Sequence, residues 1–407
     1  MTNHSITLSH SGEKINAQIP LTASKSECNR ALIIQALAGD KITLDNISEA
    51  RDSQTMKRLL QSNELELDVL DAGTTMRFLT AYCVANNRET VLTGTARMQE
   101  RPIKILVDAL RILGAEIEYK KNEGYPPIYI KSFEQKNKEV NIAGNVSSQY
   151  ISALLMIAPK LLLGISLNLE GEVTSKPYIL MTLQLLEHFG IKYTWQGANI
   201  SIEPQSYQSN HYSIESDWSG ASYWYSIVAL AKDAEIKLLG LRNNSLQGDK
   251  AIVEIMSQLG VSSTFDEEGV ILRKTTPIKE FNFDFTHCPD LAQTIAVICA
   301  AKGIKAKMTG LESLRIKETD RIAAIQNELA KINVEVVVDG DKGIEIIPNN
   351  LKVEGVVFDT YEDHRMAMAF APLSLLGNIG IEEPDVVNKS YPPYWKHLKL
   401  AGFEITE

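Results

Sequence analysis

Six segments of the chain are apolar on nearly every side of a helix, and each follows polar or charged residues. A helix without a polar face has to be buried, and the unpaired N–H groups of its first turn then need a partner inside the protein. We therefore expect three buried helices in each half of the chain, at Asn29–Ala38, Met76–Ala85, Tyr150–Ala158, Ala221–Ala231, Leu291–Ala301 and Met366–Leu376.

A second pattern is an amphipathic helix that ends at Gly or Asn and is followed by a strand, as in Ala109–Gly114 before Ala115–Tyr119. Gly or Asn just past a helix is the common left-handed C-terminal cap. The further copies are Gln184–Gly190 before Ile191–Tyr193, Ile255–Gly260 before Val261–Phe265, Glu328–Asn333 before Val334–Val338, Leu398–Gly402 before Phe403–Ile405, and the weaker Lys57–Asn63. Apart from one shorter interval, the copies recur at a spacing of roughly 70 residues, which indicates a repeated α+β subdomain rather than a solenoid unit.

Short runs of alternating polarity between these helices predict strands, for example Asn199–Ile202 and Gly269–Arg273. Together the patterns predict two globules of the α/β (α+β) class, with helices inside and sheets outside. The helix dipoles are expected to point into a shared cleft, and the polar stretch Ser209–Ser219 is the expected boundary.

The stretch Asp71–Leu79 is typical of an anion site at a helix N-terminus. Gly73 lets backbone N–H groups approach a ligand because it has no Cβ. Thr74 and Thr75 are expected to cap the following helix, and Arg77 adds a permanent cation. An ordinary capped helix is the alternative, and the repetition of polar helix starts along the chain favours the anion site.

Composition excludes several functions. The 407 residues carry a net charge of −10, which argues against a nucleic-acid-coating protein. The four cysteines (Cys28, Cys83, Cys288 and Cys299) show no metal-ligand spacing and sit in or beside apolar runs, as expected for reduced, buried thiols in a cytoplasmic protein. Met1–Ser11 is polar, so no signal peptide is expected, and no apolar run reaches the length of a membrane span.

Eight motifs then occur in order: Lys25–Arg30, Ala72–Arg77, Arg97–Ile103, Ser147–Gln149, Ser175–Tyr178, Asp217–Tyr223, Lys317–Arg321 and Asp363–Met368. In this order the chain closely resembles the 5-enolpyruvylshikimate-3-phosphate (EPSP) synthase family from about Leu21 to Lys389. The resemblance implies two similar globules joined by a two-strand hinge, each an inside-out barrel of three βαβαββ-type units. It places residues 1–20 and 217–407 in the C-terminal globule and residues 21–216 in the N-terminal globule.

The resemblance also implies the reaction, which is transfer of the enolpyruvyl group of phosphoenolpyruvate to the 5-hydroxyl of shikimate 3-phosphate. Its implied ligands for shikimate 3-phosphate are Lys25, Ser26, Arg30, Ser147, Ser148, Gln149, Ser175, Tyr178, Asp290, Ser313 and Lys317. Its implied ligands for phosphoenolpyruvate are Lys25, Gly73, Arg101, Gln149, Arg321, Arg365 and Lys389. Asp290 would take the hydroxyl proton, and Glu318 or Lys25 would exchange protons with the methylene carbon. No metal, cofactor, nucleic acid or membrane is implied; glyphosate is the implied inhibitor and a monomer is expected.

Each of these assignments has a plainer alternative. Asp290 could be a helix cap, Lys317–Arg321 a solvated helix face, and Asp363–Arg365 a first turn with a surface histidine. The tryptophans Trp195, Trp218, Trp224 and Trp395 are interpreted as core or hinge packing. At the level of function, the alternatives are an enolpyruvyl transferase acting on UDP-N-acetylglucosamine and a non-catalytic phosphate-ligand binder.

Some positions depart from the family pattern. Asp71 and Ser313 each stand where Asn is frequent, and Phe78 stands where Pro is frequent. The segment Ser62–Leu70 is shorter than usual, so the first globule is expected to lack a surface hairpin.

Overall fold

The computed structural model describes residues 4–11, 14–340 and 343–407, and these form two compact units. Unit 1 comprises Met1–Ser24, Glu49–Arg51 and Glu215–Glu407, and unit 2 comprises Lys25–Ser48 and Asp52–Ile214. The domain ranges expected from the sequence also cover residues 1–3, 12–13 and 341–342, which lie outside the described residues.

The units divide a few residues away from positions 20 and 216. Ser24 donates its N–H to the carbonyl of Glu215 at 2.8 Å, and Asp217 donates to the carbonyl of Thr22 at 2.9 Å. Ala23 and Ser216 form an isolated antiparallel bridge between the same two segments. These backbone hydrogen bonds pair the two segments at which the chain passes between the units.

The described residues of unit 1 form three four-stranded sheets. The first has the order β20 (Val356–Phe358), β21 (Ile379–Glu382), β1 (Ser5–Ser9) and β22 (Glu404–Thr406). The second has the order β14 (Val261–Phe265), β15 (Gly269–Lys274), β13 (Asp233–Leu239) and β2 (Lys14–Pro20). The third has the order β16 (Glu280–Asp284), β17 (Lys305–Thr309), β19 (Gly343–Ile347) and β18 (Glu335–Asp339).

Unit 2 contains two four-stranded sheets and one two-stranded sheet. The four-stranded sheets have the orders β10 (Thr194–Gln196), β11 (Asn199–Ile202), β9 (Ile165–Glu170), β8 (Glu139–Ala143), and β4 (Glu66–Asp68), β5 (Thr90–Thr93), β7 (Ile128–Phe133), β6 (Ala115–Tyr119). The third sheet pairs β12 (Asn210–Ser213) with β3 (Ile42–Asp45). Strand β3 is followed by α2 (Arg51–Gln61), and the short segment after α2 leads directly into β4. Residues 62–70, the segment that is shorter than usual for the family, form no hairpin.

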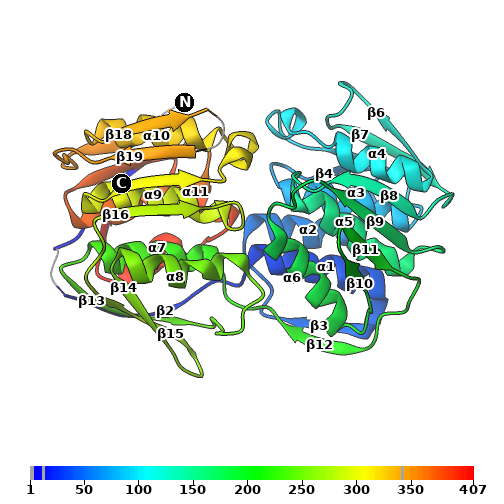
Figure 1. The fold of residues 1–407 in the computed structure, drawn as a ribbon, viewed down its shortest axis with the longest axis horizontal. Helices are drawn as coiled ribbons and strands as arrows, with labels where there is room; N and C mark the ends of the chain where they lie inside the picture. Colours follow the sequence, from blue (N-terminus) through cyan, green and yellow to red (C-terminus); the bar gives the residue numbers. More distant parts are fainter. Residues whose placement is uncertain (1–3, 12–13, 341–342) are drawn as a thin grey trace. The chain divides into compact units, whose positions relative to one another are not determined.

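Two strands far apart in the chain are exchanged between repeats. Strand β2 precedes the first buried helix but runs parallel to β13, with Lys14 opposite Asp233 and Pro20 opposite Leu239. Strand β12 precedes the fourth buried helix but runs parallel to β3. Figure 1 shows the blue β2 beside the green β13, and the green β12 beside the blue β3. Each of these two strands therefore completes a sheet whose other strands come from a distant part of the chain.

The six expected buried helices are all present. They are α1 (Lys25–Ala38), α3 (Gly73–Ala85), α5 (Ser148–Ile157), α7 (Trp218–Leu230), α9 (Ala292–Lys302) and α11 (His364–Phe370). Six further helices alternate with them: α2 (Arg51–Gln61), α4 (Lys104–Leu113), α6 (Lys176–His188), α8 (Ile252–Leu259), α10 (Arg321–Lys331) and α12 (Tyr394–Leu400). In unit 1, α9 packs against α7 and α11, and one hydrophobic core joins all three sheets. The predicted fold class, with helices inside and sheets outside, is confirmed.

One predicted strand is wrong. Ile191–Tyr193 is not extended into a sheet, and the strand begins at Thr194. The amide of Gln205 takes the place of a neighbouring strand at Lys192: its Oε1 accepts the Lys192 N–H and its Nε2 donates to the Lys192 carbonyl, both at 2.8 Å.

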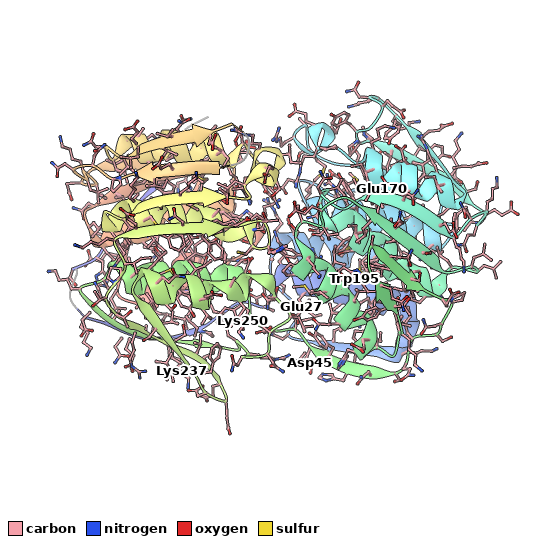
Figure 2. The ribbon with its side chains drawn as sticks, viewed as in Figure 1. Glu27, Asp45, Glu170, Trp195, Lys237 and Lys250 are labelled. Atoms are coloured by element: carbon pink, nitrogen blue, oxygen red, sulfur yellow. The ribbon has the colours of Figure 1, made fainter. Side chains whose placement is uncertain are left out.

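The tryptophans divide into two groups. Trp218 and Trp224 are fully buried in the core of unit 1, and the partly buried Trp395 packs against this core, as predicted. Trp195 instead lies on β10 near the surface (Figure 2), with the ammonium of Lys176 5.0 Å from its ring centre. Among the residues that the structure describes, no helix combines the length and the apolar character needed to cross a membrane.

Two helix C-caps allow a matched stability test. Gly114 and Gly303 both end helices with positive φ (117° and 67°), but an added Cβ meets the Glu134 carbonyl oxygen at 2.0 Å at Gly114 and no atom within 4 Å at Gly303. We expect Gly303→Ala to lower the free energy of unfolding by about 1 kcal/mol, the backbone cost alone. Gly114→Ala adds a clash and should cost about 3 kcal/mol or more. Urea unfolding measures both, and equal losses would contradict this interpretation.

Candidate active site

The predicted site residues of unit 1 form one connected cluster of charges centred on Asp290. Its carboxylate lies 3.0 Å from Arg365 Nη2, 3.0 Å from Arg321 Nη1 and 3.6 Å from Lys317 Nζ. Asp290 belongs to the short 3-10 helix Pro289–Leu291 that leads into α9, and its side chain does not cap that helix. The alternative interpretation of Asp290 as a plain helix cap is therefore wrong.

Arg321 is an almost fully enclosed cation of this cluster, with a side chain 2% exposed. Besides Asp290, it donates to Glu318 Oε2 at 2.8 Å and to Asp363 Oδ2 at 2.7 Å. It is the first residue of α10, whose N-cap is Asp320. The Lys317–Arg321 motif thus supplies a buried charge, and the alternative of a solvated helix face is wrong.

Arg365 enters the cluster from the first turn of α11. Asp363 caps this helix by accepting the Arg365 N–H at 2.8 Å, and His364 between them is buried rather than on the surface. The Arg365 guanidinium also donates to the Asp290 carbonyl at 3.2 Å and to Ser219 Oγ at 3.4 Å. Ser219 in turn donates to the buried carboxylate of Asp249.

Lys389 and Ser313 complete the unit 1 set. The Lys389 ammonium is buried, with a side chain 1% exposed, and lies 3.8 Å from Glu318 Oε1. Ser313 lies on the 3-10 helix Glu312–Ile316, just before Lys317. The cluster therefore places four cations (Lys317, Arg321, Arg365 and Lys389) against the carboxylates of Asp290, Glu318 and Asp363.

These contacts change the protonation equilibria of the cluster. Burial would raise the pKa of Asp290, but Arg365, Lys317 and Arg321 outweigh it and hold that pKa well below its usual range. Burial lowers the pKa of Lys317, assisted by Arg321 and Arg365 and opposed by Asp290 and Glu318. Asp290 is therefore a carboxylate throughout the neutral range, and Lys317 gives up its proton more readily than an exposed lysine.

In unit 2 the predicted residues form smaller groups. Lys25 begins α1, and its Nζ lies 3.2 Å from the carboxylate of Asp52 on α2. Asp52 is 3% exposed, and its carbonyl accepts the hydroxyl of Thr75 at 3.3 Å. Asp52 thus connects the start of α1 to the first turn of α3, a role that its position in the sequence did not reveal.

The guanidinium of Arg30 is buried near two aromatic rings. It donates to the Ser26 carbonyl at 2.9 Å, to Thr182 Oγ1 at 2.8 Å and to Ser152 Oγ at 3.2 Å. Its Cζ lies 5.3 Å from the ring centre of Phe78 and 5.9 Å from that of Tyr178. Burial lowers the pKa of Arg30 to about 10. Phe78, noted as a departure from the family pattern, is thus one of the two rings that face this cation.

The turn at Gly73 is held by arginines rather than by threonine caps. The N-cap of α3 is Ala72, without a side-chain hydrogen bond, so the predicted capping by Thr74 and Thr75 is wrong. Arg77 instead points back along its helix and donates to the carbonyls of Gly73 at 3.1 Å and Pro102 at 2.7 Å. The guanidinium of Arg101 lies so close to Gly73 that an added Cβ would be 2.7 Å from its Nη2.

The serine-rich motifs lie at two other helix starts. Ser147 caps α5 by accepting the Gln149 N–H at 3.4 Å, and Gln149 Nε2 donates to Thr74 Oγ1 at 3.2 Å. Ser148 is buried in the first turn of α5. Ser175 precedes α6 with a left-handed backbone (φ 51°) and makes no side-chain cap. Gln149 therefore connects the Ser147 motif with the Gly73 turn.

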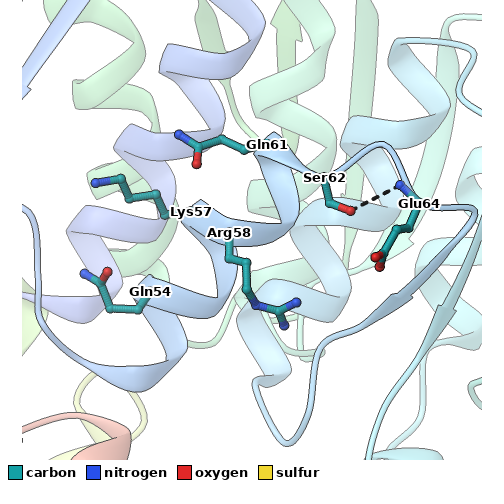
Figure 3. A pocket seen from close by; sticks show the side chains of 6 residues that line it. All are labelled: Gln54, Lys57, Arg58, Gln61, Ser62 and Glu64. Carbon is teal, nitrogen blue, oxygen red and sulfur yellow. Dashed lines mark hydrogen bonds between the residues drawn. The ribbon is translucent and has the colours of Figure 1, made fainter.

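A surface pocket on unit 2 lies away from these groups. It is lined by α2 and the loop that follows it, from Gln54, Lys57, Arg58, Gln61, Ser62 and Glu64 (Figure 3). Arg58 already donates to the Asp68 carbonyl at 3.3 Å, and Ser62 Oγ accepts the Glu64 N–H at 3.2 Å. None of the predicted site residues lines this pocket, so it is not a candidate for the active site.

Two solved structures similar to this chain are an EPSP synthase and another enolpyruvyl transferase. EPSP synthase from Acinetobacter baumannii has a TM-score of 0.81 and 19% sequence identity, covering 99% of this chain and 100% of that chain. The enolpyruvyl transferase NikO from Streptomyces tendae has a TM-score of 0.76 and 12% identity, covering 99% of each chain. At such identities the similarity shows the fold, which is that of the enolpyruvyl transferase class.

Sequence comparison narrows this class to one family. The family model of EPSP synthase (3-phosphoshikimate 1-carboxyvinyltransferase) matches residues 57–398. The 3-phosphoshikimate 1-carboxyvinyltransferase of Bacteroides fragilis is 49% identical over 400 residues, covering 96% of this chain and 97% of that protein. The protein of the same name from Aliivibrio fischeri is 36% identical over 417 residues, with 95% and 97% covered. The chain belongs to the EPSP synthase family.

The charge cluster makes a prediction that is independent of activity. Asp290→Asn keeps the side-chain shape but leaves the surrounding cations with one carboxylate fewer, so it should lower the free energy of unfolding by about 3 kcal/mol at pH 7. Because the folded pKa of Asp290 is depressed, its contribution is complete above the unfolded pKa of about 4 and is lost as the pH falls below it. The difference between parent and variant in urea unfolding should therefore stay constant from pH 7 to about pH 5 and shrink as the pH falls below about 4.

Asp320→Asn is the matched control for this measurement. Asp320 caps α10 and pairs with Arg315 at 3.0 Å, with a side chain 39% exposed. Asn is an equally good N-cap, so this variant should lose less than about 1 kcal/mol. A pH-independent loss in Asp290→Asn, or an equal loss in both variants, would contradict the ion-pair interpretation.

Proposed function

We propose that this chain transfers the enolpyruvyl group of phosphoenolpyruvate to the 5-hydroxyl of shikimate 3-phosphate and releases phosphate. Membership of the EPSP synthase family supports the reaction. The observation that carries it is the ionised Asp290 carboxylate within 3.6 Å of Lys317, Arg321 and Arg365. Such a group places a proton acceptor among cations that bind anionic substrates.

For phosphoenolpyruvate, we assign the carboxylate to Arg321 and Arg365 because a guanidinium matches its planar, two-oxygen geometry. Its phosphate is assigned to Lys25, the Gly73 backbone, Arg101, Gln149 and Lys389. The Gly73 turn supports this assignment because an added Cβ there would already touch the Arg101 guanidinium, so a small anion that follows the turn meets both groups.

For shikimate 3-phosphate, we assign the phosphate to the serine motifs and Lys317, and the carboxylate to Ser26 and Arg30. The residues assigned to the phosphate are Ser147, Ser148, Ser175, Ser313 and Lys317. Gln149 and Tyr178 would face the ring. The buried setting of Arg30 beside Phe78 and Tyr178 supports its part, because a cation that is already held in place loses little conformational entropy on binding.

The reaction then follows addition and elimination. Glu318 or Lys25 donates a proton to C3 of phosphoenolpyruvate, which leaves C2 electron-poor. The 5-oxygen of shikimate 3-phosphate bonds to C2 while Asp290 accepts its proton, giving a tetrahedral intermediate. Loss of a proton from C3 and cleavage of the C2–O bond to phosphate then form the enol ether and release phosphate.

Ligand binding would also adjust Asp290 for its role. In the free cluster the three cations hold its pKa well below the usual range, which makes it a weak base. When a substrate carboxylate pairs with Arg321 and Arg365, its negative charge offsets part of the stabilisation that these cations give to ionised Asp290. The pKa of Asp290 then rises toward values at which proton transfer from the hydroxyl is easier.

A phosphate-release assay with shikimate 3-phosphate and phosphoenolpyruvate tests the proposed reaction, with UDP-N-acetylglucosamine in place of shikimate 3-phosphate as the control. We expect release only with shikimate 3-phosphate. Asp290→Asn should lower turnover by about 10²–10⁴-fold, while calorimetry shows that shikimate 3-phosphate still binds. Loss of binding instead would make Asp290 a ligand-positioning group, and release with the control substrate would contradict the proposed specificity.

We propose in addition that glyphosate inhibits the enzyme in competition with phosphoenolpyruvate. Gly73→Ala would place a Cβ 2.7–2.9 Å from the Arg101 guanidinium and force that flexible side chain to move. The shorter phosphoenolpyruvate should suffer less from this change than glyphosate. We therefore expect Gly73→Ala to raise the inhibition constant of glyphosate by a larger factor than it lowers kcat/KM. Steady-state inhibition of both proteins measures this, and an insensitive parent would contradict the proposal.

We also propose that the protein acts as a monomer in the cytoplasm. Its four cysteines are free and buried, as expected for thiols in a reducing compartment.

A further inference from the structure

The turn that leads into α11 contains two successive residues with a left-handed backbone, neither of them glycine. Tyr361 has φ 53° and Glu362 has φ 56°. A side chain with a Cβ is disfavoured in this region, so such a turn persists only where its surroundings hold it. The next residue is Asp363, which caps α11, contacts Arg321 and accepts the Arg365 N–H. The backbone geometry of this turn therefore sets where Asp363 and Arg365 lie.

A buried carboxylate on α10 holds the turn. Glu328 is fully buried; its Oε2 accepts the Asp359 N–H at 3.0 Å, and its Oε1 accepts the Tyr361 hydroxyl at 2.8 Å. Lys331, one turn later on α10, balances the charge at 2.7 Å from Oε2. Burial, together with the hydrogen bond to Glu328, raises the pKa of Tyr361 to about 12, so its hydroxyl remains a donor at any physiological pH.

The turn also closes on itself. The Tyr361 N–H donates to Asp359 Oδ1 at 2.7 Å, and the Asp363 N–H donates to the Thr360 carbonyl at 2.8 Å. The Glu362 side chain is exposed, although its backbone has one of the two unusual φ values. Position 362 can therefore be changed without removing a buried contact.

Helix α10 contacts both ends of this turn. Its first residue, Arg321, holds Asp363 at 2.7 Å, and Glu328, two turns along, holds Asp359 and Tyr361. Because the helix is rigid between these residues, the spacing of Arg321 and Glu328 fixes the length and the direction of the turn. Neither Glu328 nor Tyr361 reaches Asp290 through a hydrogen bond of its own.

We propose that Glu328 and Tyr361 are positioning residues that hold the turn 359–363 in its disfavoured conformation and thereby place Asp363 and Arg365 against Asp290 and Arg321. This inference rests on the proposed function in one respect, the assignment of Arg365 to the carboxylate of phosphoenolpyruvate. Without Glu328 the turn relaxes toward ordinary backbone angles, and Arg365 no longer lies where that carboxylate binds.

The test removes the Glu328 side chain, which supports the turn, and in a second variant relieves the disfavoured backbone conformation at position 362. Glu328→Ala should raise the KM for phosphoenolpyruvate at least tenfold, change the KM for shikimate 3-phosphate less than twofold, and lower kcat by a smaller factor than it raises the first KM. Glu328→Gln should have a milder effect, because its amide accepts the Asp359 N–H and donates to the Tyr361 oxygen. Tyr361→Phe removes one of the two contacts and should fall between them.

The second variant distinguishes positioning from general damage. Adding Glu362→Gly to Glu328→Ala should recover most of the lost affinity for phosphoenolpyruvate, because glycine adopts a positive φ without steric cost. Adding Glu362→Ala removes the same charge but keeps a Cβ, and should recover nothing. Equal recovery by both, or recovery by neither, would overturn the proposal.

Hydrogen exchange separates this inference from the proposed reaction. In Glu328→Ala the amides of Asp359, Tyr361, Asp363 and Arg365 should exchange at least tenfold faster than in the parent, and the added Glu362→Gly should slow them again. Unchanged exchange would overturn the positioning role whatever the activity. If parent and variants show these differences in exchange but the parent releases no phosphate, the proposed reaction is overturned and the role of Glu328 remains supported.

Discussion

Charge is tolerated inside an apolar core only when it is paired, and the charge cluster of unit 1 depends on this constraint. Arg321 is almost completely enclosed and contacts Glu318, Asp290 and Asp363 at once. Each of these carboxylates has a second cationic or backbone donor, so the whole set is tied together. An anion that binds to these cations has to compete with carboxylates that already pair with them, so its affinity is the difference between two sets of ion pairs.

The apolar helices give this cluster its rigidity. Helices α9 and α11 pack against each other in the hydrophobic core, and Asp290 and Arg365 lie at or just before their first turns. Burial of the helix sides leaves their polar starts as the positions where charge can collect. Unit 2 has the same arrangement of polar residues at helix starts: Lys25, the Gly73 turn and the Ser147 motif lie at the starts of α1, α3 and α5.

The sequence predicted features that depend on local pattern. The six apolar helices and most strands follow from the residues that they contain, and the helix ends at Gly114 and Gly260 follow from one glycine each. Features that depend on distant pairing were not predictable in this way. Asp52 faces Lys25 across 27 positions, Phe78 meets Arg30 through a ring contact, and a glutamine amide replaces a strand partner at Lys192. The site residues came from the family resemblance, because no periodicity connects Asp290 with Arg365.

The exchanged strands have a consequence for the order in which a growing chain can complete its sheets on the ribosome. Strand β2 is synthesised early, but its partner β13 emerges more than two hundred residues later, and β1 lies between β21 and β22 near the C-terminus. Unit 2 needs no strand beyond β12, so all its sheets can close while most of unit 1 is still unmade. During synthesis β2 has no sheet partner until β13 is made, and β1 has none until β21 and β22 are made near the C-terminus. Pairing across such a sequence distance is slow, and it exposes apolar strand edges to misassociation during synthesis.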